Sequence, residues 1–110
     1  MKIVSLFAGA GGLDLGFSNA GFNVIWANEY DRDIWKTYEK NHPNTKLDKR
    51  SITQIPNEDV PDCDGIIGGP PCQPFSVGGK QLGLKDSRDG FPIFLSAVRQ
   101  LNPEVFLFEN

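Results

Sequence analysis

Short apolar runs alternate along this chain with amphipathic or polar stretches, and this alternation restricts the possible folds strongly. Five runs are short enough for buried strands and cover residues 3–7, 22–27, 45–47, 65–68 and 105–108. Strands that alternate with helices favour a parallel sheet covered by helices on both faces. We find no internal repeat or long linker. We therefore predict one α/β domain over residues 1–110, with a three-layer, Rossmann-like parallel sheet.

Segments whose apolar residues recur at helical spacing lie between the predicted strands. The first helix is indicated by Leu13, Phe17 and Ala20, and Gly21 is its stop signal. The last helix covers residues 93–101. Between residues 73 and 90 the chain has too many glycines and polar residues for regular structure, so we predict a loop there.

A second helix is expected to begin after Asp31, a favourable N-cap, and to end before Pro43. Three aromatic residues in periodic apolar positions are predicted core residues: Trp26, Trp35 and Tyr38. We expect His42 to be a surface or cap residue rather than a ligand.

The composition excludes several classes of protein. With 11 Lys and Arg against 14 Asp and Glu, the net charge is −3, which disfavours unaided binding to nucleic acid. No apolar run approaches the roughly 20 residues of a membrane span, and the start does not resemble a secretory signal. Two cysteines and one histidine provide neither a disulfide framework nor a zinc site. We expect a cytoplasmic protein without a metal.

The apolar run at residues 105–108 is followed by Glu109 and Asn110 alone, so no crossover returns over it. An uncovered strand leaves an exposed, apolar sheet edge. We expect the chain to be truncated after its fifth strand, with a further segment or a partner chain supplying the remainder.

The sequence FAGAGGLD follows the first strand and indicates a ligand-binding turn. Glycines at this point let the backbone approach a ligand closely. Glu29 lies at the end of the second strand, where an acidic residue usually holds ribose hydroxyls. Asp14 replaces the third glycine of the dinucleotide fingerprint, and its carboxylate would compete with a pyrophosphate. The loop therefore favours S-adenosylmethionine; a packing turn without a ligand is the alternative.

Cys72 lies in the sequence GGPPCQPFS, just beyond the carboxyl end of the fourth predicted strand. Ligands of open α/β sheets bind along this edge, and the two preceding prolines restrict the path of the chain into Cys72. We predict that Cys72 is a nucleophile. Cys63 lies between two acidic residues, which disfavour a thiolate, and we interpret it as structural.

Together, SLFAGAGGLDLGF, ANEYD, GGPPCQPFS, the GGKQLGLKDSRDG loop and the terminal FEN resemble the DNA cytosine-5-methyltransferases, in the order typical of the family. The resemblance covers the whole chain and is nearest to the bacterial restriction-modification enzymes. It implies methyl transfer from S-adenosylmethionine to carbon 5 of a cytosine flipped out of double-stranded DNA.

The resemblance also implies roles for individual residues. Cys72 would attack carbon 6 of the cytosine, and Glu109 would donate to ring nitrogen 3. The residues implied to bind the cofactor are Phe7, Gly9, Gly11, Gly12, Leu13, Glu29, Tyr30, Ser51, Ile52 and Pro71. The residues of the loop implied to contact DNA are Gln73, Ser76, Lys80, Lys85 and Arg88.

The chain departs from the family pattern at Ser51, where an acidic residue usually holds the adenine amino group. A serine hydroxyl accepts that hydrogen bond more weakly than a carboxylate. The segments that read the DNA target and complete the cofactor pocket do not occur in these 110 residues. We therefore expect the chain alone to be inactive or very weak.

Two other functions remain open at this stage. The chain could be a non-catalytic module that binds the cofactor or a partner through its uncovered sheet edge. It could also bind a dinucleotide as dehydrogenases do, although Asp14 disfavours that function.

Overall fold

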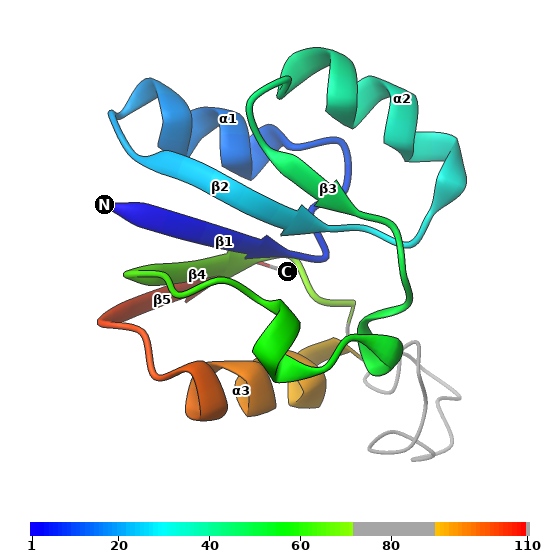
Figure 1. Cartoon of the computed structure of the whole chain (residues 1–110). Coiled ribbons are helices and arrows are strands. Elements are labelled where there is room, and N and C mark those ends of the chain that lie inside the picture. The colour runs from blue at the N-terminus through cyan, green and yellow to red at the C-terminus, as the bar shows by residue number, and fades with distance from the viewer. Residues whose placement is uncertain (72–89, 110) are drawn as a thin grey trace.

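The structure is a computed structural model that describes residues 1–71 and 90–109. Five parallel strands form one sheet in the order β3-β2-β1-β4-β5 (Figure 1). The strands are β1 (Lys2–Leu6), β2 (Asn23–Asn28), β3 (Lys46–Asp48), β4 (Gly65–Gly68) and β5 (Val105–Phe108). All five predicted strands are confirmed, and the first three are shifted by one residue.

Helices cover both faces of the sheet, as predicted for a three-layer fold. On one face lie α1 (Gly12–Asn19) and α2 (Arg32–Asn41) (Figure 1). On the other lie α3 (Gly90–Leu101) and two short 3₁₀ helices, η1 (Ile52–Gln54) and η2 (Asn57–Asp59). No helix in the described part of the chain is long and apolar enough to cross a membrane.

The helix boundaries follow local signals in the sequence. The Asp31 carboxylate accepts a hydrogen bond from the Asp33 amide at 3.0 Å, so Asp31 caps α2 as predicted. After α1, Gly21 adopts a left-handed φ of 95°. The structure corrects the start of α3, which begins at Gly90 rather than at residue 93. Pro92 is compatible with this start because the first turn of a helix leaves amides unpaired.

Two apolar clusters hold the layers together. The cluster towards α3 includes Leu6, Trp26 and Phe94, whereas the cluster towards α1 includes Ile3 and Val24. The prediction that Trp26 and Tyr38 are core residues is confirmed. Trp35 is half-buried instead, and the cationic ends of Arg32 and Lys49 lie 6.0 and 5.2 Å from the centroid of its ring.

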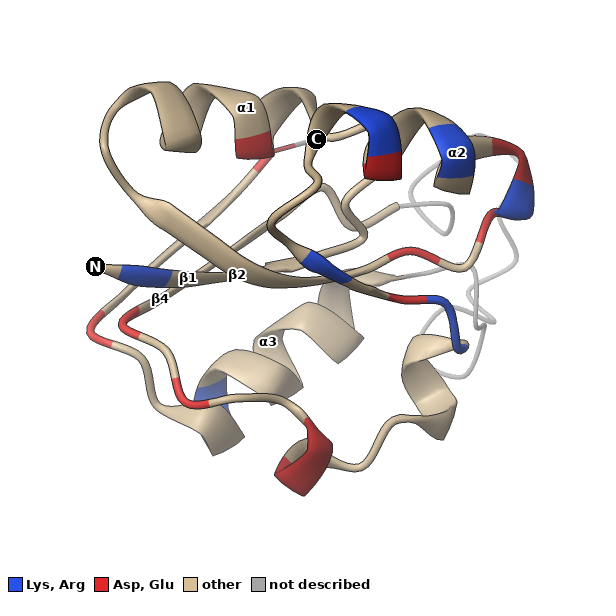
Figure 2. Ribbon diagram, turned by 45° about the horizontal axis from the view of Figure 1, so that its top comes forward, with Lys and Arg blue, Asp and Glu red and all other residues tan. Residues whose placement is uncertain are grey.

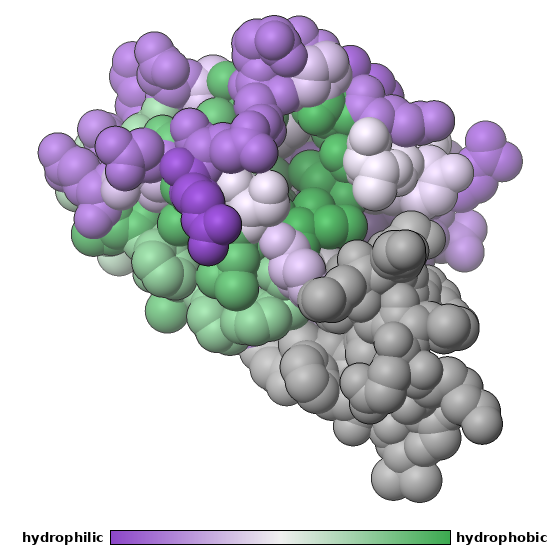
Figure 3. Space-filling model, turned by 90° about the horizontal axis from the view of Figure 1, so that it is seen from below, coloured by the Kyte–Doolittle hydropathy of each residue, from purple (hydrophilic) through white to green (hydrophobic). Residues whose placement is uncertain are grey.

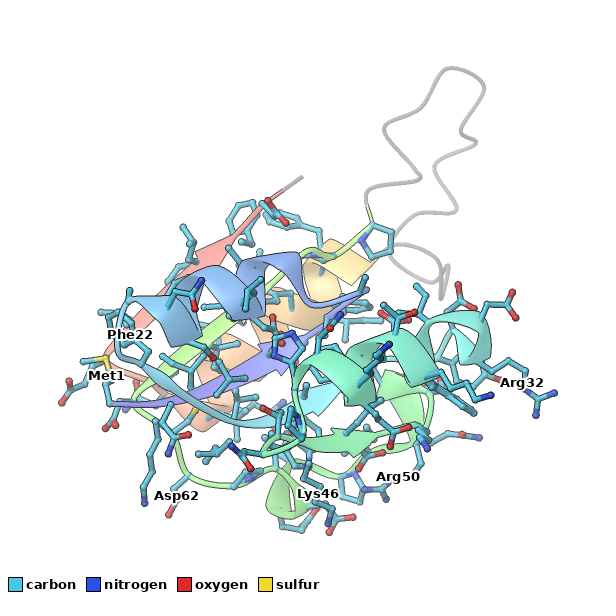
Figure 4. The ribbon with its side chains drawn as sticks, turned by 90° about the horizontal axis from the view of Figure 1, so that it is seen from above. Met1, Phe22, Arg32, Lys46, Arg50 and Asp62 are labelled. Atoms are coloured by element: carbon cyan, nitrogen blue, oxygen red, sulfur yellow. The ribbon has the colours of Figure 1, made fainter. Side chains whose placement is uncertain are left out.

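Exposed apolar surface is concentrated along β5. All four residues of this strand are exposed, from 39% at Phe108 to 51% at Val105. Their exposure agrees with the expectation of an uncovered strand. An apolar groove of about 310 Å³ runs between β5 and the pair formed by Met1 and Phe22, two residues that lie side by side in Figure 4.

Charge is distributed unevenly over the two helical layers. Acidic and basic residues are mixed along α2, whereas α3 carries Arg99 as its single charged residue (Figure 2). Hydrophobic residues gather on the face that includes α3, with hydrophilic residues along one margin (Figure 3).

Candidate cofactor and catalytic site

The carboxyl ends of all five strands meet at one edge of the sheet, because the strands are parallel. The chain passes from β1 through β2 to β3 on one side, and β4 then pairs with β1 on the other. Such a reversal of strand order is the usual ligand site of an open α/β sheet. The glycine loop, Glu29, the Gly69–Pro71 segment and Glu109 all follow strands at this edge.

The glycine loop after β1 has three left-handed residues, Phe7, Gly9 and Gly11, with φ values of 52°, 60° and 91°. A Cβ added at Gly9 or Gly12 would meet nothing within 4 Å, so both positions have open space for a ligand. A Cβ at Gly11 would instead collide with His42 and with Tyr38 Cε2 at 2.9 Å. Gly11 therefore faces α2, while Gly9 and Gly12 can face a cofactor.

Glu29 is held against this loop. Its Oε1 accepts a hydrogen bond from the Gly9 amide at 2.8 Å, and its Oε2 accepts one from the Asp31 amide at 2.9 Å. The Trp35 indole donates to the Glu29 carbonyl at 2.7 Å. Each carboxylate oxygen can accept a second bond, so Glu29 can still receive ribose hydroxyls.

Other predicted cofactor residues lie around this centre. Tyr30 is 67% exposed beside Glu29. Leu13 packs against the apolar cluster under α1, and Ile52 packs against the cluster towards α3. The side chains of Leu13 and Ile52 therefore pack into the core on opposite faces of the sheet.

The segment after β3 is ordered by a residue that the sequence analysis missed. Buried Asn28 donates from Nδ2 to the carbonyls of Asp48 and Arg50, both at 2.8 Å. Ser51 then contacts the Thr53 hydroxyl at 3.0 Å. A polar residue at the end of a buried strand was the available signal, since buried polar groups need partners.

The carboxylate of Asp48, three residues before Ser51 in the sequence, is already engaged. Arg50 pairs with Asp48 at 2.7 Å and with Asp59 at 3.1 Å. Its hydrogen bonds to Asp48 lower the pKa of that carboxyl. Lys46 and Arg50 lie along the same margin in Figure 4. Asp48 therefore does not replace the acid missing at Ser51 unless this ion pair opens.

Phe7 and Pro71 lie together at the β4 side of the site. The Gly90 amide donates to the Pro71 carbonyl at 2.8 Å. A Cβ at Gly90 would lie 2.6 Å from Phe7 Cζ and 2.7 Å from Pro71 Cδ. This packing fixes both rings beside the start of α3. The predicted nucleophile Cys72 and the DNA-loop residues lie outside the described residues.

Glu109 is placed next to the segment that precedes Cys72. Its amide donates to the Gly68 carbonyl at 3.0 Å. Its Cγ lies 3.8 Å from the position of a Cβ at Gly69, and the Phe7 carbonyl lies at the same distance from that position. The glycine loop, the Gly69 turn and Glu109 thus converge at one edge.

Cys63 is half-buried and packs against the apolar cluster towards α3. Burial raises the pKa of its thiol, and neighbouring Asp64 and Asp62 raise it further. This environment agrees with the prediction that Cys63 is structural. Within the described residues, no three His, Cys, Asp or Glu side chains form a group that could hold a metal ion.

Four residues form a buried group beneath the loop: Ser5, Asp14, Tyr38 and His42. Asp14 lies in the first turn of α1, as predicted, but it is 1% exposed and accepts hydrogen bonds from Ser5 and Tyr38. The expectation that its carboxylate competes with a pyrophosphate was wrong, because both oxygens are engaged inside the protein. His42 is the C-cap of α2, as predicted, but it is buried rather than on the surface. The expectation of a surface or cap residue is met by the cap, and the ring is buried because it stacks on Tyr38, with centroids 4.5 Å apart.

A glycine loop after β1 and an acidic residue after β2 define the class of α/β proteins that bind nucleoside cofactors. Within that class, residues 1–110 match the family model described as C-5 cytosine-specific DNA methylase, and the chain belongs to this family. The methyl donor of the family is S-adenosylmethionine.

Similar proteins support this membership. The chain is 53% identical over 111 residues to Type II methyltransferase M.FnuDI of Fusobacterium nucleatum, and 50% identical over 112 residues to Type II methyltransferase M.NgoPII of Neisseria gonorrhoeae. Both matches cover 100% of this chain, but 32% and 33% of the relatives. The chain therefore spans about a third of the length of these relatives.

A solved structure shares the fold. It is the crystal structure of a protein described as a DNA modification methyltransferase encoded within an E. coli prophage. Its comparison with this chain gives a TM-score of 0.82 and 34% sequence identity. The match covers 98% of this chain and 31% of the other.

Proposed function

We propose that this chain forms the cofactor-binding and nucleophile-bearing part of a DNA cytosine-5-methyltransferase. One observation carries the proposal: the glycine loop, Glu29, the turn leading to Cys72, and Glu109 follow strands at the same sheet edge. Family membership is consistent with this chemistry. The substrate is a cytosine flipped out of double-stranded DNA.

S-adenosylmethionine fits the residues present at the loop. Gly9 and Gly12 leave open space, and Glu29 keeps acceptor capacity for two hydroxyls. When bound, the cofactor supplies an electrophilic methyl group on a positively charged sulfur. Glu29 suits the ribose hydroxyls of the nucleoside part of this cofactor. The choice of S-adenosylmethionine over a dinucleotide rests on the family to which the chain belongs.

Cys72 activates the base for methylation. Its thiolate forms a bond to carbon 6 of the cytosine, and the electron pair of the double bond between carbons 5 and 6 makes carbon 5 nucleophilic. After carbon 5 has gained the methyl group, loss of its proton to a base restores the double bond and expels the Cys72 thiolate. The cysteine is therefore regenerated in each cycle.

Glu109 assists the addition step. A proton or strong hydrogen bond from its carboxyl group to ring nitrogen 3 offsets the negative charge that builds up on the ring. Its main-chain bond to Gly68 and its closeness to Gly69 keep the carboxyl group near the turn that leads to Cys72.

We assign DNA contact and target reading to other parts of the protein. Lys80, Lys85 and Arg88 are proposed to contact DNA phosphates. Reading of the DNA target and completion of the cofactor pocket are assigned to a C-terminal segment or a complementary chain. The 110 residues alone are then inactive or very weak. A cytoplasmic location would keep Cys72 reduced.

A chimera tests the proposal directly. This chain replaces the N-terminal third of M.FnuDI, which it matches at 53% identity, and the chimera is incubated with S-adenosylmethionine and DNA containing 5-fluorocytosine at the M.FnuDI site. A base cannot abstract the fluorine as it does a proton, so the covalent adduct accumulates. We expect an adduct that withstands denaturing electrophoresis.

Two cysteine variants form a matched pair in this test. Cys72→Ala should abolish the adduct, whereas Cys63→Ala should retain it. An adduct that survives Cys72→Ala, or a chimera that forms none while M.FnuDI itself does, would refute the proposed mechanism.

The exposed β5 strand favours a second candidate, a non-catalytic module that binds a partner chain or the cofactor. Its four apolar residues and the adjoining groove offer a surface for such a partner. Sedimentation and calorimetry separate the two functions. Tight association without binding of S-adenosylhomocysteine by the chain or by the chimera would favour the module.

A further inference from the structure

A buried chain of hydrogen bonds connects β1, α1 and α2 beneath the glycine loop. Ser5 Oγ donates to Asp14 Oδ1 at 2.7 Å, and the Tyr38 hydroxyl donates to Asp14 Oδ2. Ser5, Asp14 and Tyr38 are at most 1% exposed. Figure 4 looks onto the layer of α1 and α2 that covers this group. A carboxylate buried this deeply is costly unless its oxygens are paired, and both oxygens have a donor here.

The same group reaches the loop through His42. Its Nε2 lies 3.1 Å from the Gly11 carbonyl oxygen, and its ring stacks on Tyr38. A carbonyl oxygen can only accept, so His42 Nε2 carries the proton in this contact. The Gly11 carbonyl also accepts the Leu15 amide at 2.8 Å, which is the first helical bond of α1.

Gly11 leaves no space between the loop and these rings. A side chain there would overlap His42 and Tyr38, and the φ of 91° would strain any other residue. Gly9, two residues earlier, meets no such neighbour and donates to Glu29. One side of the loop therefore faces the Tyr38–His42 rings, and the other faces the ribose-binding carboxylate.

The direction of the Tyr38 bond is fixed by its surroundings. Burial, with the neighbouring Asp14 carboxylate, raises the pKa of the Tyr38 phenol far above its usual range. A raised pKa favours the protonated phenol, which is the form that donates to Asp14. The hydroxyl links α2 to the first turn of α1.

We propose that Asp14, Tyr38 and His42 are positioning residues that hold the left-handed turn at Gly11 and so keep the loop in the shape that receives the cofactor. This inference rests on the proposed function, because it assigns the loop to S-adenosylmethionine. The three residues are buried beneath the loop and act through the backbone of Gly11 and the first turn of α1.

Amide hydrogen exchange of the chain without ligand tests the positioning role, and Tyr38→Phe is the main variant. It leaves one Asp14 oxygen without its donor. We expect the Gly11 and Leu15 amides to exchange about tenfold faster, the effect of losing one hydrogen bond to a charged group. The reference amides are those of Ile66 and Ile67 in β4, which should change far less.

Tyr30→Phe is the matched control, since it removes the same hydroxyl from an exposed tyrosine. It should leave the exchange of Gly11 and Leu15 unchanged. Equal acceleration of loop and β4 amides in Tyr38→Phe would overturn the inference, because the bond would then serve global stability alone. If Tyr38→Phe fails to fold, the pair His42→Ala and His42→Gln replaces it. Gln can restore a donor to Gly11, so it should recover the slow exchange that Ala loses; equally fast exchange in both would also overturn the inference.

Binding of S-adenosylhomocysteine to the chimera, measured by calorimetry, is the second readout. We expect Tyr38→Phe to weaken binding about tenfold. Failure of the unsubstituted chimera to bind would count against the proposed function, whereas the exchange result would still decide the positioning role. Unchanged affinity in a variant with a loosened loop would contradict the link between the loop's shape and the cofactor.

Discussion

β2 and β5 occupy equivalent places on either side of the central pair β1 and β4, yet they differ sharply in burial. β5 is wholly apolar, and all of its residues are exposed. β2 has an asparagine at each end, and Asn28 is 2% exposed. The more hydrophobic strand is therefore the less buried one.

The difference between β2 and β5 comes from what lies next to each strand. β2 has β3 as a neighbour and lies between helical layers on both faces. β5 is the outermost strand; Phe108 contacts Phe91 and Phe94 on α3, with ring centroids 4.9 and 6.0 Å apart, but the opposite face borders an open groove. Burial thus depends on the cover that the tertiary structure provides, not on hydropathy alone.

The largest difference between the strands should appear on truncation of their aromatic residues. Trp26→Ala in β2 should lower the free energy of unfolding by about 3–5 kcal/mol, because it empties a closed site. Phe106→Ala in β5, where the ring is 49% exposed, should cost about 1 kcal/mol. Urea unfolding measures both. Equal losses would show that β5 is covered in solution.

The ends of the two strands differ as well, and Asn28→Ala probes the end of β2. Removal of its amide takes one donor from the Arg50 carbonyl and leaves the Asp48 carbonyl with the Glu29 amide, at a cost of about 1–3 kcal/mol. Asn23→Ala, at the exposed start of the same strand, should stay within about 0.5 kcal/mol. Chemical denaturation of the two variants gives the comparison, and a larger loss at Asn23 would contradict it.

A pH dependence below neutral pH is expected from Asp14, in the layer that covers β1 and β2. Desolvation by burial raises the pKa of Asp14 above its ordinary value of 3.8. Because the folded-state pKa lies above the unfolded one, the contribution of this group to stability is complete below that ordinary value and is lost as pH rises through the folded-state pKa. Asp14→Asn should remove this dependence, so the wild type should lose stability relative to the variant with rising pH.

Unfolding curves of the wild type and Asp14→Asn between about pH 3 and 6 check this prediction. The other titratable groups facing Asp14, Tyr38 and His42, are present in both proteins. A stability difference that stays constant or moves in the opposite direction would contradict the assigned cause.

The smallest effect on stability is expected at the exposed face of β5. Leu107→Lys should change the unfolding free energy by a few tenths of a kcal/mol, because surface changes are usually small. It should nevertheless reduce any self-association seen by sedimentation, since Leu107 lines the apolar groove. Leu15→Lys is the control, with the same 47% exposure outside that groove. Equal effects of both substitutions on association would rule out a specific role for the groove.

Local sequence patterns determined the strands, several helix ends and the position of the glycine loop. Short apolar runs predicted all five strands, because a buried strand consists of a few consecutive side chains that are excluded from water. Asp31 and Gly21 marked helix ends, since a cap depends on a few neighbouring residues. The loop after β1 and Glu29 were likewise evident, and the structure joins them through the Gly9 amide.

Only the tertiary structure decided which side of the loop packs against protein and which side stays open. Gly9 and Gly11 look alike in the sequence, but Gly11 packs on His42 and Gly9 faces open space. The pairing of Asp14 with Ser5 and Tyr38 joins three elements, so no local pattern could reveal it. Hydrogen-bond partners and cover are set by segments distant in the chain, and such contacts exist only once the layers have packed.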